Sequence, residues 1–291
     1  GIRDRLRSRG LGDVYKRQAI IASGLIPLYL ICKRHKLSNA AVILFSLCYV
    51  LLPSMANGCF FFLHENKFLT PLILWLAFAL EKNKWIPSVI FTLLLLAVKE
   101  DAPVYAAVLG LYFIVSRRNI SKGALVFVLS IIYFITVSYF MSKYGLGTMS
   151  YRYDNFIYDG SGSLFTVIKA VILNPIYTVH EAFDEEKIKF ILQMLVPLAF
   201  MPLMIKKPSR IILLIPFILL NLMSDYTYQH NINFQYTYGS AAFLFYLMIL
   251  NYQDMKPGFR CKVLAVAATS SIFMFMCNTY YRTCLLYTSP S

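Results

Sequence analysis

The chain has 291 residues, of which 58% are hydrophobic and only 14% are charged. Soluble domains carry roughly a quarter of charged residues, so this composition excludes an ordinary soluble domain. Apolar runs separated by short basic clusters recur from Ala19 to Asn278. The alternation predicts an all-α fold, a polytopic bundle of transmembrane helices in a single domain.

Both ends of the chain look foreign to this pattern. Residues 13–18 back-translate as GAT GTG TAT AAG AGA CAG, the end of a widely used transposase sequencing adapter, and residues 284–289 translate its reverse complement. We therefore expect 1–18 and 284–291 to be adapter-derived and 19–283 to be one transmembrane domain, truncated at its N-terminus. Six of the 28 Lys and Arg residues lie in 1–18, so the net charge of +14 does not predict a nucleic-acid partner.

The apolar runs differ in length. The predicted spans, in chain order, are 19–32, 39–56, 68–80, 85–98, 102–115, 123–141, 188–205, 211–223, 238–250 and 263–278. The run 123–141 is the clearest full span, whereas several others hold only 13 or 14 residues against the roughly 20 that a straight crossing needs. This predicts short, broken or re-entrant helices, which are tolerated inside protein or beside a water-filled cavity.

The longest polar interval runs from Ser142 to Lys187. Within it, 164–173 is a short apolar segment with one lysine, and Asn174-Pro175 follows. We predict that this segment is a helix lying along the outer membrane surface.

Basic residues predict the orientation. The five segments 33–36, 81–84, 117–122, 206–210 and 254–262 hold 14 of the 22 Lys and Arg residues that lie outside 1–18, but only two acidic residues. The positive-inside rule places these segments in the cytoplasm of a multi-pass protein of the cell membrane. The remaining acidic residues and three of the four histidines then face the extracytoplasmic side.

Eight polar residues at the ends of spans are predicted to face the outer side and to form a site: His64, Glu65, Lys99, Glu100, Asp101, Arg152, Asp225 and His230. Carboxylates and histidines can act as general bases or hold a divalent metal ion, and Lys and Arg can bind a phosphate. The alternatives are a structural ion pair at 99–101, an interfacial anchor at Arg152, and solvated loops elsewhere. Tyrosines at 151, 153, 226, 228, 236 and 238 either stack on a sugar ring or belong to the interfacial aromatic belt.

Several motifs resemble a family. Phe62-Leu63-His64-Glu65 followed by Pro71-Leu72 resembles a Phe-X-His-(Pro/Glu) pattern before a Pro-Leu-rich helix, and Lys99-Glu100-Asp101 resembles a Lys-Glu-Asp signature. Tyr151-Arg152-Tyr153 is similar to an Arg-Tyr element, and 220–225 to a Leu-Asn-Leu-Leu-Ser motif. The family is the predicted membrane proteins of domain of unknown function 2079. Tyr236-Thr237-Tyr238 departs from its usual His-Tyr.

The resemblance implies a fold similar to the GT-C glycosyltransferases, which take a sugar from a polyprenyl phosphate at the outer membrane face. It makes Glu100, Asp101, His64 and Glu65 the candidate catalytic residues, and Lys99, Arg152, Asp225 and His230 the candidate substrate-binding residues. The catalytic carboxylate of such enzymes usually lies in the first outer loop, so this chain is not expected to be active as it stands. The alternative function is a non-enzymatic carrier or flippase that uses the same polar cluster.

Overall fold

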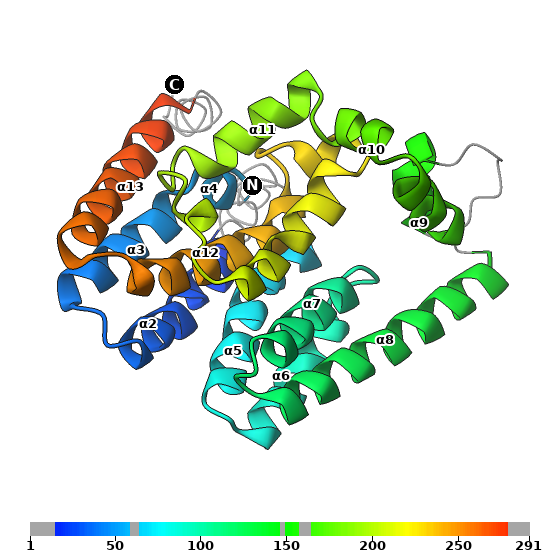
Figure 1. The fold of residues 1–291 in the computed structure, drawn as a ribbon, viewed down its shortest axis with the longest axis horizontal. Helices are drawn as coiled ribbons and strands as arrows, with labels where there is room; N and C mark the ends of the chain where they lie inside the picture. Colours follow the sequence, from blue (N-terminus) through cyan, green and yellow to red (C-terminus); the bar gives the residue numbers. More distant parts are fainter. Residues whose placement is uncertain (1–14, 59–63, 146–148, 157–163, 279–291) are drawn as a thin grey trace, which may run out of the picture.

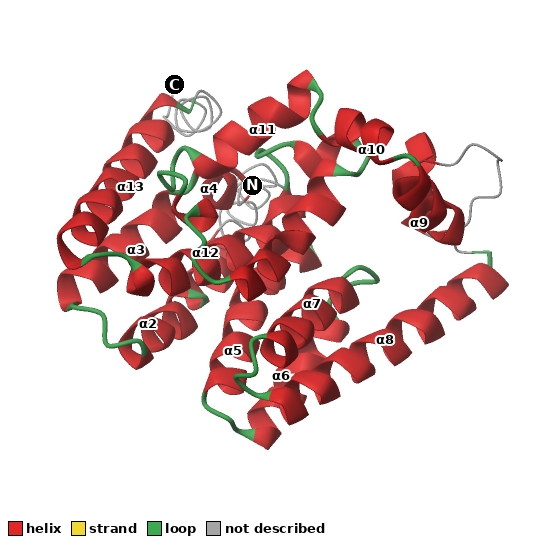
Figure 2. Ribbon diagram, in the orientation of Figure 1, coloured by secondary structure: helices red, strands yellow, loops and turns green. Residues whose placement is uncertain are grey.

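The computed structural model describes residues 15–58, 64–145, 149–156 and 164–278. The predicted adapter-derived ends lie outside the described residues, apart from 15–18, which begin a helix that runs to residue 23. Every regular element of the described residues is a helix, as Figure 2 shows. This confirms the predicted all-α fold.

The elements follow one another through short connections (Figure 1). The first half of the chain forms α2 (Leu25–Arg34), α3 (Asn39–Leu51), α4 (Pro53–Asn57), η2 (Glu65–Phe68), α5 (Leu69–Glu81), α6 (Trp85–Leu96), α7 (Ala102–Val115) and α8 (Ile120–Lys143). The second half forms η3 (Met149–Phe156), α9 (Leu164–Leu173), α10 (Pro175–Ala182), α11 (Glu185–Leu195), η4 (Met201–Leu203), η5 (Pro208–Leu214), η6 (Phe217–Leu222), η7 (Thr227–His230), η8 (Gln235–Thr237), α12 (Tyr238–Asp254) and α13 (Pro257–Cys277).

Helix α12 is the centre of the molecule. All its residues from Tyr238 to Tyr252 are buried, and it passes through the middle of the ribbon in Figure 1. A helix that is apolar on every side has no face for water, so it takes an interior place. Helix α5 and the segments η4 and η5 pack against it.

Two helices are long and apolar enough to cross a membrane, α8 with 24 residues and α13 with 21. At about 1.5 Å per residue they extend roughly 36 and 32 Å, enough for a hydrocarbon core of about 30 Å. Helix α8 confirms the predicted full span at 123–141. Its exposed side chains include Ile132 and Ile135, as a lipid-facing surface requires.

Helices α6 and α7 are short, as predicted, with 12 and 14 residues. At the helical rise they extend only about 18 and 21 Å. Helix α7 lies very close to α8, because a Cβ at Gly110 would stand 2.7 Å from the carbonyl oxygen of Gly123. Only glycine allows the two backbones to approach this closely.

The predicted spans 188–205 and 211–223 are broken, in agreement with the prediction of short or broken helices. Helix α11 ends at Leu195, and the chain then turns through Ala199 and Phe200, which have positive φ of 49° and 54°. The second run is a 3-10 segment, η5, followed by a π-helical turn, η6. Prolines inside both runs remove helical N–H donors, which explains why neither continues as an α-helix.

Side chains from α12 and α13 satisfy the backbone at the first break. The Asn251 amide donates to the carbonyls of Met201 and Pro202 at 3.0 and 2.9 Å. The Ser270 hydroxyl donates to the carbonyl of Val196 at 2.8 Å. Irregular backbone is tolerated at membrane depth only when protein groups replace the lost hydrogen bonds in this way.

The predicted cytoplasmic segments meet at one end of the bundle. Glu81, the last residue of α5, lies 2.8 Å from His35, 3.3 Å from Arg34 and 3.7 Å from Arg118. The Asn119 amide donates to the carbonyl of Leu80 at 3.0 Å. Three of the five basic segments are therefore in contact.

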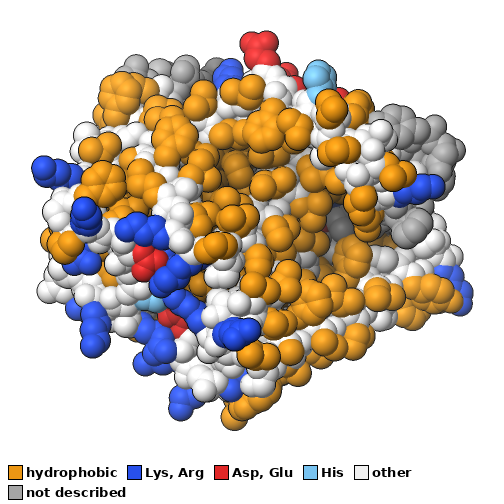
Figure 3. All heavy atoms as spheres, in the orientation of Figure 1, with side chains coloured by type: hydrophobic (Ala, Val, Ile, Leu, Met, Phe, Trp, Pro, Cys, Tyr) orange, Lys and Arg blue, Asp and Glu red, His pale blue; other side chains and the backbone are white. Residues whose placement is uncertain are grey.

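The other two basic segments meet each other at the same end. Asp254 contacts Arg210 at 2.6 Å and Lys207 at 3.3 Å, and the Gln253 amide donates to the carbonyl of His35 at 3.0 Å. Figure 3 shows Lys and Arg side chains gathered at the lower left of the face drawn, while much of the rest is hydrophobic. The structure confirms the grouping of the basic segments, and their cytoplasmic side stays a prediction.

The segment predicted as a surface helix is α9, and Asn174 separates it from α10. Its exposed apolar side chains include Ile168, Ile172 and Leu173. The helix is confirmed, and its place on the membrane surface stays a prediction.

Candidate functional site

The charged triplet Lys99-Glu100-Asp101 forms the tight connection between α6 and α7. Helix α6 ends at Leu96, and α7 begins at Ala102 with Pro103 in its first turn. The turn is short because proline favours the first turn of a helix, where its missing N–H is not needed. All three charged side chains are therefore fixed at the N-terminal end of α7.

Arg152, from the η3 segment, joins the triplet from a distant part of the sequence. Its Nη2 lies 3.1 Å from Glu100 Oε1 and its Nη1 lies 3.2 Å from Asp101 Oδ2. The residue is 4% exposed, and its Nε donates to the Tyr151 hydroxyl at 3.2 Å. A planar guanidinium holds two carboxylates in a fixed fork geometry, whereas an ammonium group is a point charge with rotatable donors.

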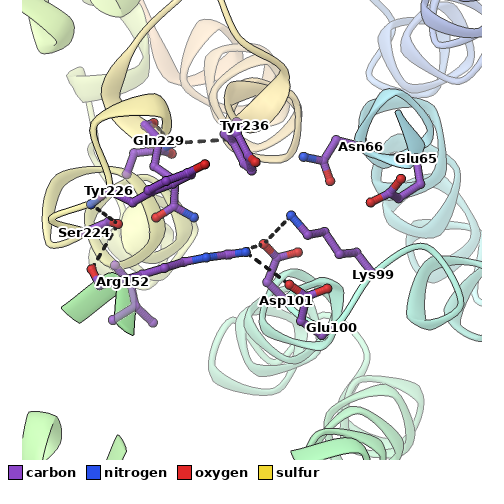
Figure 4. Close-up of polar contacts among 12 residues, drawn as sticks. Glu65, Asn66, Lys99, Glu100, Asp101, Arg152, Ser224, Tyr226, Gln229 and Tyr236 are labelled. Atoms are coloured by element: carbon purple, nitrogen blue, oxygen red, sulfur yellow. Dashed lines mark hydrogen bonds and ion pairs between the residues drawn. The ribbon is translucent and has the colours of Figure 1, made fainter. Parts of the chain in front are cut away.

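The backbone and one amide hold Arg152 in place. Its carbonyl oxygen accepts from the Asp225 backbone N–H at 2.8 Å and from the Ser224 hydroxyl at 3.2 Å. With its amide turned to the orientation that its neighbours require, the buried Gln229 side chain donates to the Leu220 carbonyl at 2.9 Å and accepts from Arg152 Nη1 at 3.2 Å. Figure 4 shows these residues on one side of the cluster and the triplet on the other.

Asp101 has bonding capacity that the fold does not use. Its Oδ2 receives both Arg152 and Lys99, the latter at 3.7 Å, whereas its buried Oδ1 makes no hydrogen bond with any described residue. Asp101 is also the N-cap residue of α7, yet its side chain does not cap the helix. Asp184, by contrast, caps α11 through the Lys187 N–H at 2.8 Å. Asp101 thus lacks the hydrogen bond with which an N-cap aspartate usually stabilises a helix, which indicates that this residue has a role other than helix stability.

Lys99 connects the charged cluster to His64. Its ammonium lies 4.8 Å from the centre of the Tyr236 ring, a distance at which a cation is attracted to an aromatic face. The ring of His64 lies 6.2 Å from the same tyrosine. His64 Nδ1 accepts from the Asn66 backbone N–H at 3.3 Å, and Glu65 Oε1 is 3.3 Å away.

The surroundings fix the charge states of two of these groups. Burial lowers the pKa of His64, the Lys99 ammonium lowers it further, and Glu65 only partly offsets them. His64 is therefore a neutral imidazole at pH 7 and can accept a proton. Burial alone would lower the pKa of Arg152, but the Tyr151 hydroxyl and the Asp101 carboxylate outweigh it, so the pKa is raised and the charge is permanent.

The predicted site residues divide into two groups. The structure brings together Lys99, Glu100, Asp101 and Arg152, with His64 at the edge of the same cluster. The other three stand apart from its centre: Glu65 is half exposed beside His64, Asp225 is exposed and contributes its backbone, and His230 faces Glu186 at 3.7 Å.

Two contributors were not assigned from sequence. Gln229 was missed because a single glutamine between polar residues carries no motif, and only the fold turns it towards Arg152. Tyr236 was left between sugar stacking and the aromatic belt, and its position over the Lys99 ammonium now gives it a specific contact.

A divalent metal ion was one of the predicted roles for this cluster. Within the described parts of the chain, no three His, Cys, Asp or Glu side chains gather as they do around a metal ion. The carboxylates of Glu100 and Asp101 are both paired to Arg152. A metal-binding role for these carboxylates stays a prediction.

An apolar groove begins directly beside the charged cluster. It has a volume of about 290 Å³ and lies between α7, α8, α9 and η6. Its lining includes Pro103 and Tyr153, the residues that stand next to Ala102 and Arg152 in the chain, as well as Ile131 and Ile168. Figure 3 shows this face hollowed between α8 and α10, with hydrophobic side chains around the hollow. A ligand in the groove would have an apolar body and a polar end at the cluster.

Comparison with known proteins gives a family but no functional precedent. A family model described as "Predicted membrane protein (DUF2079)" matches residues 17–290, which confirms the resemblance inferred from the motifs. No curated protein and no solved structure matches the chain.

Proposed function

We propose, for a chain that belongs to the DUF2079 family of predicted membrane proteins, a glycosyltransferase function similar to that of the GT-C enzymes. The enzyme takes a sugar from a polyprenyl phosphate at the outer face of the cell membrane. The observation that carries this proposal is the buried cluster of Asp101, Arg152 and Lys99, whose chain neighbours Pro103 and Tyr153 line an apolar groove. A lipid-linked phosphate has an apolar chain that suits the groove and an anionic group that suits the cations of the cluster.

The groove supplies the site for the lipid chain. Its walls are aliphatic and aromatic side chains, such as Val104, Val108, Phe134 and Leu219. A long isoprenoid gains free energy from each methylene and methyl group that it buries, at about 25 cal/mol per Å² of apolar surface. The phosphate at the end of the chain then reaches the η3 segment, where Arg152 lies.

The cluster supplies the site for the phosphate. Its two cations and two carboxylates balance, so an incoming phosphate has to displace one acid. Glu100 is the candidate because its side chain is 26% exposed, whereas that of Asp101 is 6% exposed. Arg152 Nη2 and the Lys99 ammonium then stabilise the negative charge that develops on the leaving phosphate.

The remaining groups act on the acceptor. Asp101 Oδ1 accepts the proton of the acceptor hydroxyl, since that oxygen has no other partner in the described structure. The neutral imidazole of His64, steadied by the Asn66 N–H, orients the hydroxyl, and Glu65 supports His64. General-base catalysis of this kind contributes about 10²–10⁴-fold to rate.

The test is transfer of labelled sugar from a polyprenyl phosphate by the intact protein in membrane vesicles. We expect transfer by the wild type and its loss in Asp101→Asn and Arg152→Ala. Wild-type turnover in both variants would remove the proposed site. Binding of the labelled lipid without any transfer would instead favour a carrier or flippase.

The groove has its own test, because α9 offers a matched pair of positions. Ile168 lines the groove and is 57% exposed, whereas Ile172, one turn later, does not line it and is 70% exposed. We expect Ile168→Glu to raise the KM for the lipid donor by about tenfold, since a charge in an apolar site costs well over 1.4 kcal/mol. Ile172→Glu should leave KM unchanged, and equal effects of the two would exclude the groove as the lipid site.

A further inference from the structure

A second, polar cavity lies on the other side of the η7 segment. It has a volume of about 400 Å³, within the usual range of about 300–1,000 Å³ for ligand pockets. Its lining is mostly polar and comes from α11, η7, the segment after η7 and the end of α13. The residues that matter here are Glu186, Lys189, Gln193, His230, Asn231 and Asn233.

His230 gives this cavity an unused hydrogen-bonding group. Its side chain is 7% exposed, its Nε2 lies 3.7 Å from Glu186 Oε2, and its Nδ1 makes no hydrogen bond with any described residue. A buried polar atom without a partner costs free energy, so such atoms are uncommon unless a ligand completes them. Burial also lowers the pKa of His230 and the nearby Lys187 ammonium lowers it further, while Asp184, Glu186 and Asp225 partly oppose this.

The wall of the cavity is held in advance by an amide chain. The fully buried Asn57 of α4 donates to Asn233 at 2.8 Å and accepts from Asn278 at 2.9 Å. The Asn233 backbone N–H donates to Asn231 Oδ1 at 3.0 Å. Three segments far apart in the sequence are thus bonded to one another, and a ligand need not order them on binding.

We infer that this cavity is a binding site for a neutral, hydroxyl-rich ligand, a saccharide. The amides and the neutral imidazole can donate to and accept from hydroxyl groups, the Glu186 carboxylate accepts, the Lys189 ammonium donates, and these groups line a cavity of sugar size. Nothing in the charged cluster offers such a set. The cavity is separate from the charged cluster, because Gln229 of η7 contacts Arg152 whereas the next residue, His230, lines the polar cavity. The inference does not depend on the proposed function, in which the acceptor hydroxyl lies at Asp101 and His64.

The test is saturation-transfer difference NMR of the intact protein in lipid nanodiscs, with glucose, mannose, galactose and N-acetylglucosamine as probes. We expect a signal for at least one sugar and a loss of about fivefold or more in His230→Leu, as the removal of one or two hydrogen bonds predicts. His180→Leu is the matched control, because that histidine is exposed and lies outside the cavity. Its signal should equal that of the wild type.

A second variant guards against a failure of folding. Thr227 is exposed at the rim, so Thr227→Trp should leave the fold intact and block the cavity. Sugar signals no larger than those of empty nanodiscs, or unchanged signals in both His230→Leu and Thr227→Trp, would overturn the inference. Sugar binding that is lost in both variants, in a protein that transfers no sugar from the lipid, would support the inference and remove the proposed function.

Discussion

Two buried carboxylates, Glu81 and Asp101, stand at opposite ends of the bundle. Their side chains are 4% and 6% exposed, and both are surrounded by cations. Glu81 receives His35 of the α2–α3 turn and the Tyr246 hydroxyl of α12, each at 2.8 Å. Asp101 is paired with Lys99, two residues before it, and with Arg152.

The difference lies in what each carboxylate has left over. Glu81 Oε1 contacts His35 and Tyr246, and Oε2, although it makes no hydrogen bond within the described residues, has the Arg34 guanidinium 3.3 Å away. These partners tie together helices far apart in the sequence. Asp101 Oδ1 has neither a hydrogen bond nor an ion pair with a described residue, and an apolar groove lined by Pro103 lies nearby. The cavity beside Glu81, of about 490 Å³, is instead lined by charged groups such as Arg34 and Arg118. A buried charge alone therefore does not indicate a functional site. A buried carboxylate oxygen without a hydrogen-bond or ion-pair partner, near a cavity whose lining suits a ligand, does.

The largest expected effect comes from Asp101→Asn. The substitution keeps the shape of the side chain and removes its capacity as a base, so kcat for sugar transfer should fall by about 100-fold or more. Labelled-sugar transfer from a polyprenyl phosphate measures it. Glu185→Gln, an exposed acid-to-amide change on α11, is the control and should retain wild-type kcat. Wild-type turnover in Asp101→Asn would show that Asp101, like Glu81, has only a structural role.

Glu81→Gln should act on the fold instead. Removing this charge leaves His35, Arg34 and Arg118 without their shared partner, and loss of one member of a buried ion pair costs about 3 kcal/mol. Denaturant unfolding of the protein in detergent measures the free energy. Asp101→Asn should cost less, because Arg152 keeps Glu100 and Gln229. A larger loss in Asp101→Asn than in Glu81→Gln would reverse the comparison.

Much of this contrast was predictable from the sequence, because hydrophobic periodicity and the basic clusters depend on local patterns. The runs of apolar residues predicted α8 and the short helices α6 and α7, and the basic clusters predicted which loops meet at the end around Glu81. Broken helices were predicted, but the place of the break within 188–205 was not. That break at Ala199 and Phe200 depends on Asn251 of a distant helix, which satisfies the freed carbonyls.

The site was predictable only where its residues carry an unusual pattern. Three adjacent charges in an apolar chain identified Lys99, Glu100 and Asp101, and Arg152 stood out in a polar interval. Nothing local distinguishes Gln229, whose contact with Arg152 depends on the turn at η7. His230 was predicted to join the charged cluster, and the same turn directs it into the polar cavity instead.

A smaller effect on activity is expected from lysine substitutions of two arginines, Arg152 at the Asp101 end of the bundle and Arg118 at the Glu81 end. Arg152→Lys keeps the charge but cannot reach Glu100, Asp101 and Gln229 together, so kcat/KM should fall by about tenfold. Arg118→Lys is the matched change at the other end, where one guanidinium nitrogen lies 3.7 Å from Glu81 and the side chain is 31% exposed. That variant should stay within about twofold of the wild type. Equal losses would show that bidentate geometry at Arg152 is not required.

The smallest effect is a dependence of stability on pH through His64. Its folded pKa is lowered from 6.5 by burial and by Lys99, so below about pH 6.5 the unfolded chain takes up a proton more readily than the folded one. The contribution of His64 is therefore fully present above about pH 6.5 and is lost as pH falls towards the folded pKa. Denaturant unfolding at about pH 7.5 and about pH 5.5 should show a larger decrease in the wild type than in His64→Asn. His180→Asn, which removes an exposed imidazole, is the control and should show the same pH dependence of stability as the wild type. An identical pH dependence in wild type and His64→Asn would mean that His64 is solvated, and the acceptor-orienting role proposed for it would then fail.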